Sequence, residues 1–291
     1  NSAEYVGIPK KIIQKELLES EMVSQVINFN VAHTISTPYW LEKPFVNTYV
    51  VEDKNNHLKA KNDATFIFDI EMDIEGNKLV TQVPLEFKKA DPAFGERRRE
   101  GICTPDFTVN FNEKSIILKE GQSKKIALKV HSFKENIQSE ITLVAPENWI
   151  LSETKIPIHL KTTHEDYFVE IVLTSTKNSK RGALKAIDSK GNEIKSYTEI
   201  AYDHIPTQVI FKSSEMECVK IDANIKAGKI AYIKGAEDVV PEAIAQLGFD
   251  IEVFQVADLS SLDLAKYQTV VLGIRIYNLH SEMRNFEDKL L

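Results

Sequence analysis

Apolar and polar residues alternate along much of the chain, and the alternation predicts β-strands. The most regular stretch is TFIFDIEMDIEGNKLVTQVPLEF, residues 65–87. A period of two places its first apolar set on one face of a strand: Phe66, Phe68, Ile70, Met72 and Ile74. Gly76-Asn77 then predicts a tight hairpin turn. The returning strand carries the apolar face back through Leu79, Val83, Leu85 and Phe87.

Two further observations complete the prediction for the first region. Pro84 has no N–H to donate, so the returning strand should lie at an edge or contain a bulge. The segment VSQVINFNVAH, residues 23–33, has the pattern of another strand, whereas KIIQKELLESE, residues 11–21, would also suit a helix. We therefore predict an antiparallel β-sandwich over residues 1–95.

Residues 96–105 are charged and broken by Gly101 and Pro105, which predicts a linker. The arginine cluster 97–99 within it lies between two glutamates and is interpreted as a solvated face rather than an anion site. Short strands with turns between them then recur over 106–205, at the spacing typical of an immunoglobulin-like β-sandwich. We expect Trp149 to cap its core.

The pattern changes after a second predicted linker at residues 206–227. In residues 228–291, apolar strands (KIAYIKG, DIEVFQV, TVVLGI) alternate with short helices. Strands that are apolar on both faces and separated by helices predict a parallel sheet. Three strands are present where a flavodoxin-like domain has about five, so the prediction is a partial flavodoxin-like α/β domain. Its edge strand, 269–274, would be open to self-association.

Composition narrows the classes of partner. The net charge of −7 and pI of about 5.6 disfavour binding to nucleic-acid phosphates. No apolar run approaches the roughly 20 residues that span a bilayer. The two cysteines, Cys103 and Cys218, show neither metal-ligand spacing nor a disulfide framework.

Tyr39 and Trp40, in STPYWLEKPF, are the first candidate binding residues. If their rings are exposed, they could stack on the face of a sugar. If they are buried, they close the bottom of a sandwich. The sequence leaves both interpretations open, so a glycan is the small-molecule partner considered.

The loops after the first and third strands of the α/β region supply the remaining candidates. Open α/β sheets bind ligands at the carboxyl ends of their strands, where the sequence places Gly235, Asp238, Arg275, Tyr277 and Asn278. Against a site, the loops contain no G-x-G-x-x-G, no phosphate-binding lysine and no serine or cysteine nucleophile. A structural turn therefore stays open as the alternative, and we expect no catalytic residue here.

The seven histidines show no metal-ligand spacing along the chain. His164-Glu165-Asp166, between two predicted strands, is interpreted as a polar β-turn. We therefore expect neither a metal site nor a cofactor in this chain.

Four stretches carry a resemblance to a known family. STPYWLEKP (36–44), AYDHIPTQVIF (201–211), GAEDVVPEAIAQLGFDI (235–251) and VVLGIRIYN (270–278) resemble the long members of the LmbE-like, or PIG-L, de-N-acetylase family of Bacteroidota. The resemblance implies an N-terminal zinc deacetylase domain, β-sandwich modules and a glutamine-amidotransferase-like domain of flavodoxin type. The second sandwich also resembles the NPCBM-associated modules attached to glycoside hydrolases.

The family's zinc motif, A-H-P-D-D, is absent from this sequence, so no catalytic or metal-binding role is carried over to any residue. The resemblance implies an internal piece of a longer hydrolase, with zinc only in the missing domain. Its setting would be periplasmic or extracellular. We expect a non-catalytic accessory region of a carbohydrate-directed de-N-acetylase. The alternatives are a stand-alone carbohydrate-binding or protein-interaction module and a degenerate amidotransferase-like ligand-binding domain.

Overall fold

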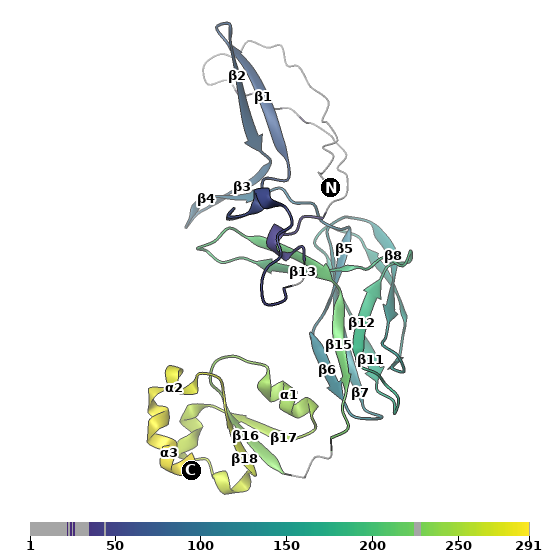
Figure 1. Ribbon diagram of the computed structural model, residues 1–291, viewed down its shortest axis with the longest axis vertical. Helices are drawn as coiled ribbons and strands as arrows, with labels where there is room; N and C mark the ends of the chain where they lie inside the picture. The colour runs from purple at the N-terminus through teal and green to yellow at the C-terminus, as the bar shows by residue number, and fades with distance from the viewer. Residues whose placement is uncertain are drawn as a thin grey trace. The chain divides into compact units, whose positions relative to one another are not determined.

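Strands dominate the computed structural model of the chain (Figure 1). Of the residues that the structure describes, 44% are strand and 14% helix. The structure describes residues 22, 24, 26, 35–43, 45–223 and 228–290. The chain divides into two compact units. The first is Asn1–Pro105 with Tyr197–Phe211, and the second is Asp106–Ser196 with Lys212–Leu291.

The first unit contains β-hairpins. Its elements are the 3₁₀ turns η1 (Tyr39–Leu41) and η2 (Lys54–Asn56) and the strands β1 (Ile67–Ile74), β2 (Asn77–Pro84), β3 (Glu86–Asp91) and β4 (Gly95–Glu100). β1 pairs with β2 and β3 with β4, each pair forming a separate two-stranded antiparallel sheet. The tip of a third two-stranded sheet, between β13 (Lys195–Ile200) and β14 (Gln208–Ser213), also belongs to this unit.

The β1–β2 hairpin has the predicted alternation, and its turn lies one residue earlier than predicted. Ile74 already pairs with Asn77, so Glu75 and Gly76 form the turn, with φ of 51° and 83°. Positive φ at both positions is the requirement of the turn that matches strand twist. Pro84 ends β2 in a sheet of two strands, as its missing N–H predicts.

Two predictions for residues 1–105 need correction within the described residues. The structure places two-stranded sheets here instead of two packed sheets, and most of the predicted strand 23–33 lies outside the described residues. The predicted linker at 96–105 contains strand β4. Arg97, Arg98 and Arg99 form ion pairs there, for example with Asp203 at 3.0 Å and Glu199 at 2.9 Å. Carboxylates of the paired strand and of nearby segments compensate the arginine charges, so this charged segment can form a strand.

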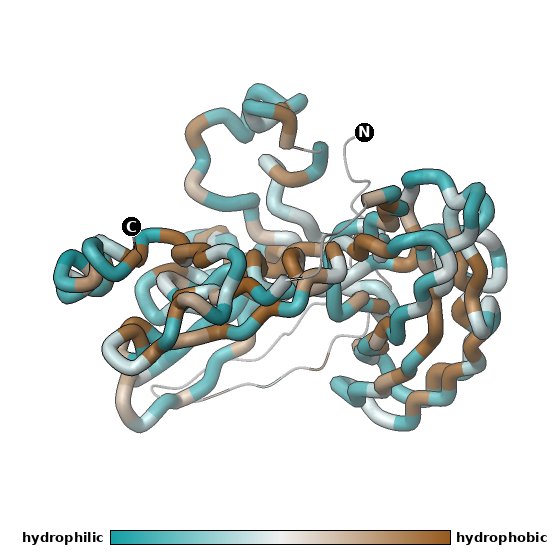
Figure 2. The backbone as a smooth tube through the Cα atoms, turned by 90° about the horizontal axis from the view of Figure 1, so that it is seen from below, coloured by the Kyte–Doolittle hydropathy of each residue, from teal (hydrophilic) through white to brown (hydrophobic). Residues whose placement is uncertain are grey.

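A two-sheet β-sandwich forms the larger part of the second unit. One sheet has the order β10-β8-β12-β15-β6 and the other β5-β7-β11-β9. The strands are β5 (Phe107–Phe111), β6 (Ser115–Leu118), β7 (Ser123–Ser132), β8 (Ile137–Val144), β9 (Ile150–Leu151), β10 (Lys155–Leu160), β11 (Asp166–Thr174), β12 (Gly182–Ile187) and β15 (Glu215–Lys220). Figure 2 colours the backbone by hydropathy, and brown hydrophobic positions recur between teal hydrophilic ones.

The sandwich core is continuous across both sheets. Leu128 and Ile171 from one sheet and Ile141 and Leu184 from the other are at most 1% exposed. Trp149 closes the core as predicted, being 6% exposed, and its Nε1 donates to the Lys180 carbonyl at 2.8 Å. Burying such side chains contributes roughly 1.5–3 kcal/mol each, so this core holds most of the hydrophobic stabilisation.

The predicted linker at residues 206–227 also needs correction, because it supplies two strands. β14 lies in it, and β15 is an interior strand of the sandwich, paired with β12 and, in parallel, with β6. Met216 and Cys218 alternate with charged residues in β15, and both are fully buried. Burial raises the pKa of the Cys218 thiol to about 11. The sandwich therefore extends beyond residue 205.

The remainder of the second unit is a three-stranded parallel sheet with the order β17-β16-β18. Its elements are β16 (Lys229–Ile233), α1 (Val240–Gln246), β17 (Asp250–Phe254), η3 (Val256–Ser260), η4 (Leu264–Lys266), β18 (Thr269–Leu272), α2 (Ile276–Leu279), η5 (Ser281–Phe286) and α3 (Glu287–Leu290). Ile233, Val256, Leu259, Ile276 and Met283 form its core. No helix in the described ranges is long and apolar enough to cross a membrane.

Candidate functional site

The loops that follow β16 and β18 meet at the carboxyl edge of the parallel sheet. Ala236 N–H donates to the Ile274 carbonyl at 2.8 Å, and Gly273 N–H donates to the Ile233 carbonyl at 2.8 Å. A Cβ on Gly235 would lie 2.4 Å from the Ile274 carbonyl oxygen, and one on Gly273 would lie 2.4 Å from the Gly235 nitrogen. Glycine is thus required at both positions for this backbone contact.

Asp238 bonds the two loops together. Its carboxylate accepts hydrogen bonds from the Tyr232 hydroxyl at 2.7 Å, the Val240 N–H at 2.9 Å and the Ile274 N–H at 3.4 Å. The Tyr232 hydroxyl is the main cause of the lowered pKa of Asp238, and the two N–H groups lower it further. Burial, together with Asp238, raises the pKa of Tyr232 to about 12. These bonds give Asp238 a structural role at the edge.

Arg275 occupies the sharp turn between β18 and α2. Its backbone is left-handed, with φ 56° and ψ 22°, and its carbonyl accepts from the N–H groups of Asn278 and Leu279. A non-glycine residue in this region of φ and ψ is uncommon. Arg275, Tyr277 and Asn278 are all exposed. The structure therefore brings Gly235, Asp238 and the Arg275 turn to one edge, with the other two candidates on the adjoining helix.

Tyr39 and Trp40 lie in η1 of the first unit, and both are half-buried. The Tyr39 hydroxyl donates to the Lys59 carbonyl at 2.7 Å, and its N–H donates to Asn62 Oδ1 at 2.9 Å. The two rings meet edge to face, with centroids 4.9 Å apart and planes at 88°. Tyr39 is therefore anchored by two polar contacts, and Trp40 packs against its ring.

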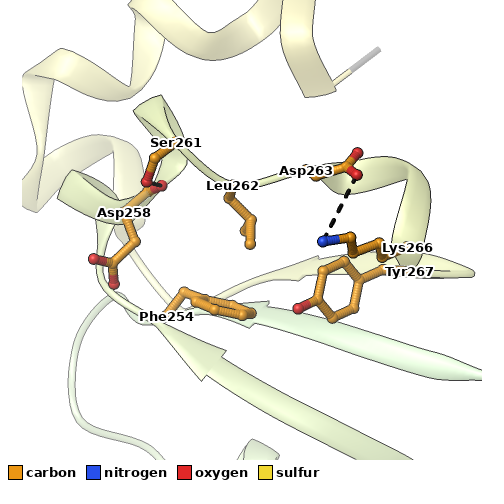
Figure 3. Close-up of a pocket in the computed structure, with 7 residues that line it drawn as sticks. All are labelled: Phe254, Asp258, Ser261, Leu262, Asp263, Lys266 and Tyr267. Carbon is orange, nitrogen blue, oxygen red and sulfur yellow. Dashed lines mark hydrogen bonds and ion pairs between the residues drawn. The ribbon is translucent and has the colours of Figure 1, made fainter.

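An open cavity of about 440 Å³ lies among residues that the sequence did not single out (Figure 3). Its lining residues are Phe254, Asp258, Ser261, Leu262, Asp263, Lys266 and Tyr267. Phe254 and Tyr267 meet edge to face at 5.7 Å, and the Tyr267 hydroxyl donates to Glu252. In Figure 3, Leu262 points toward Phe254. The residues that line the cavity come together only when η3 and η4 fold over the end of β17.

The polar turn predicted at His164-Glu165-Asp166 is present in part: Thr163 and His164 form the turn, and Asp166 is already the first residue of β11. His164 has φ 60°, and the Glu165 carboxylate accepts from the N–H groups of Lys161 and Thr162 at 2.6 and 3.0 Å. These bonds lower the pKa of Glu165. Within the described residues, no group of three or more His, Cys, Asp or Glu side chains is arranged to hold a metal ion.

Comparison with known proteins identifies no relative that assigns a function. No family model matches the chain, and no curated protein matches it. Among solved structures, it is similar to an Escherichia coli α2-macroglobulin fragment from domain MG7 to the C-terminus, with 12% identity and a TM-score of 0.27 over 39% of this chain. It is also similar to Salmonella α2-macroglobulin reacted with methylamine, with 16% identity and a TM-score of 0.29 over 50% of this chain. The chain spans 16% and 10% of those two proteins.

Proposed function

We propose that this chain is the non-catalytic accessory region of a carbohydrate-directed zinc de-N-acetylase of the LmbE-like, or PIG-L, type. Its role is to space the catalytic domain or to present it to a glycan. The catalytic zinc belongs to a domain outside this sequence. The α/β part is, in this proposal, the beginning of a flavodoxin-like, amidotransferase-like domain, and the sandwich is an immunoglobulin-like module.

One observation carries the non-catalytic assignment. The carboxyl edge of the α/β sheet is where a doubly wound domain would hold a ligand, and here its two loops are bonded to each other. Asp238 accepts three hydrogen bonds, from the Tyr232 hydroxyl of β16, the first N–H of α1 and the Ile274 N–H of the other loop. Gly235 and Gly273 meet at backbone distance. A carboxylate with three donors already in place is poorly suited to act as a base or a ligand.

Two further features support the proposal, one for the spacer role and one for the α/β domain. The sandwich core runs through both sheets, so the module is rigid enough to hold a neighbouring domain at a fixed distance. The strand order β17-β16-β18, all parallel, matches the first three strands of the flavodoxin-like order 2-1-3-4-5.

The test compares two substrates in the parent protein. If the region presents the enzyme to a polymer, Trp40→Ala lowers kcat/KM on a polymeric N-acetyl glycan and leaves kcat/KM on a soluble N-acetyl monosaccharide unchanged. Phe94→Ala is the matched control, because Phe94 is a 63% exposed aromatic in the same unit. Equal loss on both substrates, or acetate release by the present chain alone, contradicts the proposal.

The half-buried Trp40 favours a second candidate, a carbohydrate-binding module in its own right. The hydroxyl and the backbone N–H of Tyr39 are both hydrogen-bonded, so its ring is held in place. The Trp40 indole packs against that ring, which orients it as stacking on a sugar requires. In this case the chain alone binds a glycan in calorimetry, and Trp40→Ala abolishes the binding without changing the melting temperature. If Trp40→Ala still binds the glycan, Trp40 is not the binding residue and this candidate is wrong.

The open edge of the α/β sheet favours self-association as an additional property. Thr269–Leu272 pairs with β16 on one side, and the described residues provide no strand on its other side. Exposed edges recruit another strand. Light scattering coupled to size exclusion should show a dimer that Leu272→Pro dissociates. The Gly273 N–H points to Ile233 of β16, so the N–H of Leu272, one position earlier, lies on the open side, and proline removes that donor. A monomer at all concentrations contradicts this.

A further inference from the structure

Three polar side chains lie in a row across the sheet β5-β7-β11 of the sandwich. Thr108 pairs with His131 in register, and His131 pairs with Asp166. Directly paired residues of antiparallel strands share a face. The core residues Leu128 and Val130 occupy the alternate positions of β7, so the row lies on the face turned away from the sandwich core.

His164 joins this row from the turn before β11. Its Nδ1 lies 3.5 Å from Nε2 of His131, and the two ring centroids are 5.6 Å apart. On the other side of the His131 ring, Nδ1 lies 2.6 Å from Asp166 Oδ1. A carboxylate at this distance favours the tautomer with the proton on Nδ1 and leaves the lone pair of His131 Nε2 facing His164.

The spacing of the two imidazole nitrogens suits a shared metal ion. Two nitrogens each about 2.0–2.1 Å from one tetrahedral ion lie roughly 3.4 Å apart, close to the 3.5 Å seen between His131 and His164. A direct hydrogen bond from nitrogen is shorter, about 2.7–3.2 Å. The carboxylate–histidine pair Asp166–His131 is also the arrangement that orients metal-bound histidines.

Both rings are held in place before any ion binds. The His131 side chain is only 14% exposed, and Phe133 meets it edge to face at 4.8 Å. His164 is fixed by its left-handed backbone and by its N–H, which donates to the Ser132 carbonyl at 2.9 Å. Preorganised ligands lose little entropy on binding.

The Thr108 hydroxyl supplies a second, independent observation. Thr108 is fully buried, and its Oγ1 has no hydrogen-bond partner among the described residues. An unsatisfied buried hydroxyl costs about 1–3 kcal/mol. Thr108 lies directly opposite His131 in register, so the row contains an uncompensated polar group on the strand next to this histidine.

We propose that His131 and His164 form a two-histidine site for one late transition-metal ion, of the class Zn²⁺, Ni²⁺ or Cu²⁺, with its coordination completed by water. Imidazole selects this class over Mg²⁺ and Ca²⁺, which take oxygen ligands. Lys129, whose Nζ is 2.9 Å from Asp166 Oδ2, adds a positive charge nearby and should keep the affinity modest. The site does not depend on the proposed function, and it departs from the absence of metal that histidine spacing in the sequence predicts.

Calorimetric titration of the whole chain with Zn²⁺ in chelator-free buffer tests the proposal. We expect one ion per chain, and a Kd at least tenfold weaker in His131→Ala and His164→Asn. Asparagine tolerates the left-handed backbone of residue 164, so His164→Asn keeps the test valid if His131→Ala fails to fold. Asp166→Asn should weaken binding by roughly 10–100-fold through loss of ring orientation.

The matched control is His159→Ala, which removes an exposed histidine on β10 in the other sheet. Its Zn²⁺ affinity should equal that of the unmodified chain. The proposal is overturned by an affinity that is unchanged in both site variants, or by the absence of Zn²⁺ uptake even at millimolar concentration. The second result would leave a direct hydrogen bond between the two rings as the explanation of their contact.

Discussion

The β1–β2 hairpin of the first unit and the β7–β11 pair of the sandwich have the same sequence pattern and different burial. Both are antiparallel pairs with apolar residues at every second position. In the hairpin, Met72 and Leu79 pair across the strands and remain 39% and 49% exposed. In the sandwich, Leu128 and Ile171 are at most 1% exposed.

The difference shows that alternation defines a face and does not decide whether the face is covered. The apolar face of β7–β11 packs against the second sheet, β10-β8-β12-β15-β6. A two-stranded hairpin is only marginally stable by itself. The sandwich should therefore be the stable part of the chain, and the hairpin should depend on whatever covers it.

Truncating the sandwich core should have the largest effect. Ile171→Ala leaves a cavity in a fully buried site and should lower the free energy of unfolding by about 2–5 kcal/mol. Met72→Ala, the matched change in the hairpin, should lower it by less than about 1 kcal/mol. Ile171→Ala is measured by urea unfolding in a Trp40→Phe background, where Trp149 is the only tryptophan and reports the sandwich. Met72→Ala is measured in a Trp149→Phe background, where Trp40 reports the first unit. Equal losses would remove the contrast between the two regions.

The carboxyl edge of the α/β sheet gives an intermediate case, in which backbone contact replaces side-chain packing. Gly273→Ala would press its Cβ on the Gly235 nitrogen and should destabilise this part by about 1–3 kcal/mol. Gly228→Ala is the control, since its Cβ meets the side chain of Gln268, which can move. Amide exchange of residues 230–233 reports the effect. If exchange rises as much in the control, the backbone contact is not the cause.

The anchoring of Tyr39 should contribute less. Tyr39→Phe removes one partly buried hydrogen bond, to the Lys59 carbonyl, and should lower the stability of the first unit by about 0.5–1.5 kcal/mol. Trp40, next to it, is the natural fluorescent reporter in a Trp149→Phe background. A change within error would mean that the loop around Lys59 does not hold the ring in solution.

The smallest expected effect is the loss of stability around Asp238 at acidic pH. The pKa of Asp238 is lowered in the folded chain, chiefly by the Tyr232 hydroxyl, so its contribution to stability is present above its unfolded pKa of about 3.9. That contribution is lost as the pH falls through the folded pKa. Exchange of the amides of Val240 and Ile274 should therefore rise below about pH 4. In Asp238→Asn, the acid dependence should be absent; if it persists, another carboxylate is responsible.

The sequence predicted the elements whose periodicity is strong. The alternation in residues 65–87 and the buried Trp149 were predicted correctly, as was the mainly β character of the chain. β4 and β15 were missed because their charged residues resemble a linker until their partners are known.

Contacts between distant residues could not be predicted. His131 and His164 are 33 positions apart, and only the pairing of β7 with β11 brings them together. The cavity between Phe254 and Tyr267 likewise requires the folded η3 and η4. The sequence did place Gly235 and Asp238 at the carboxyl edge of the sheet, and it could not show that their loops bond to each other.

Hydrogen exchange resolved by segment tests the central contrast most directly. The amides of Ile126, Leu128 and Val130 in β7 should exchange through global unfolding of the sandwich, because they lie in its continuous core. The amides of residues 68–74 in β1 should exchange orders of magnitude faster, through local opening of the hairpin. Equal, slow exchange in both segments would contradict the account, because the hairpin would then be as stable as the sandwich.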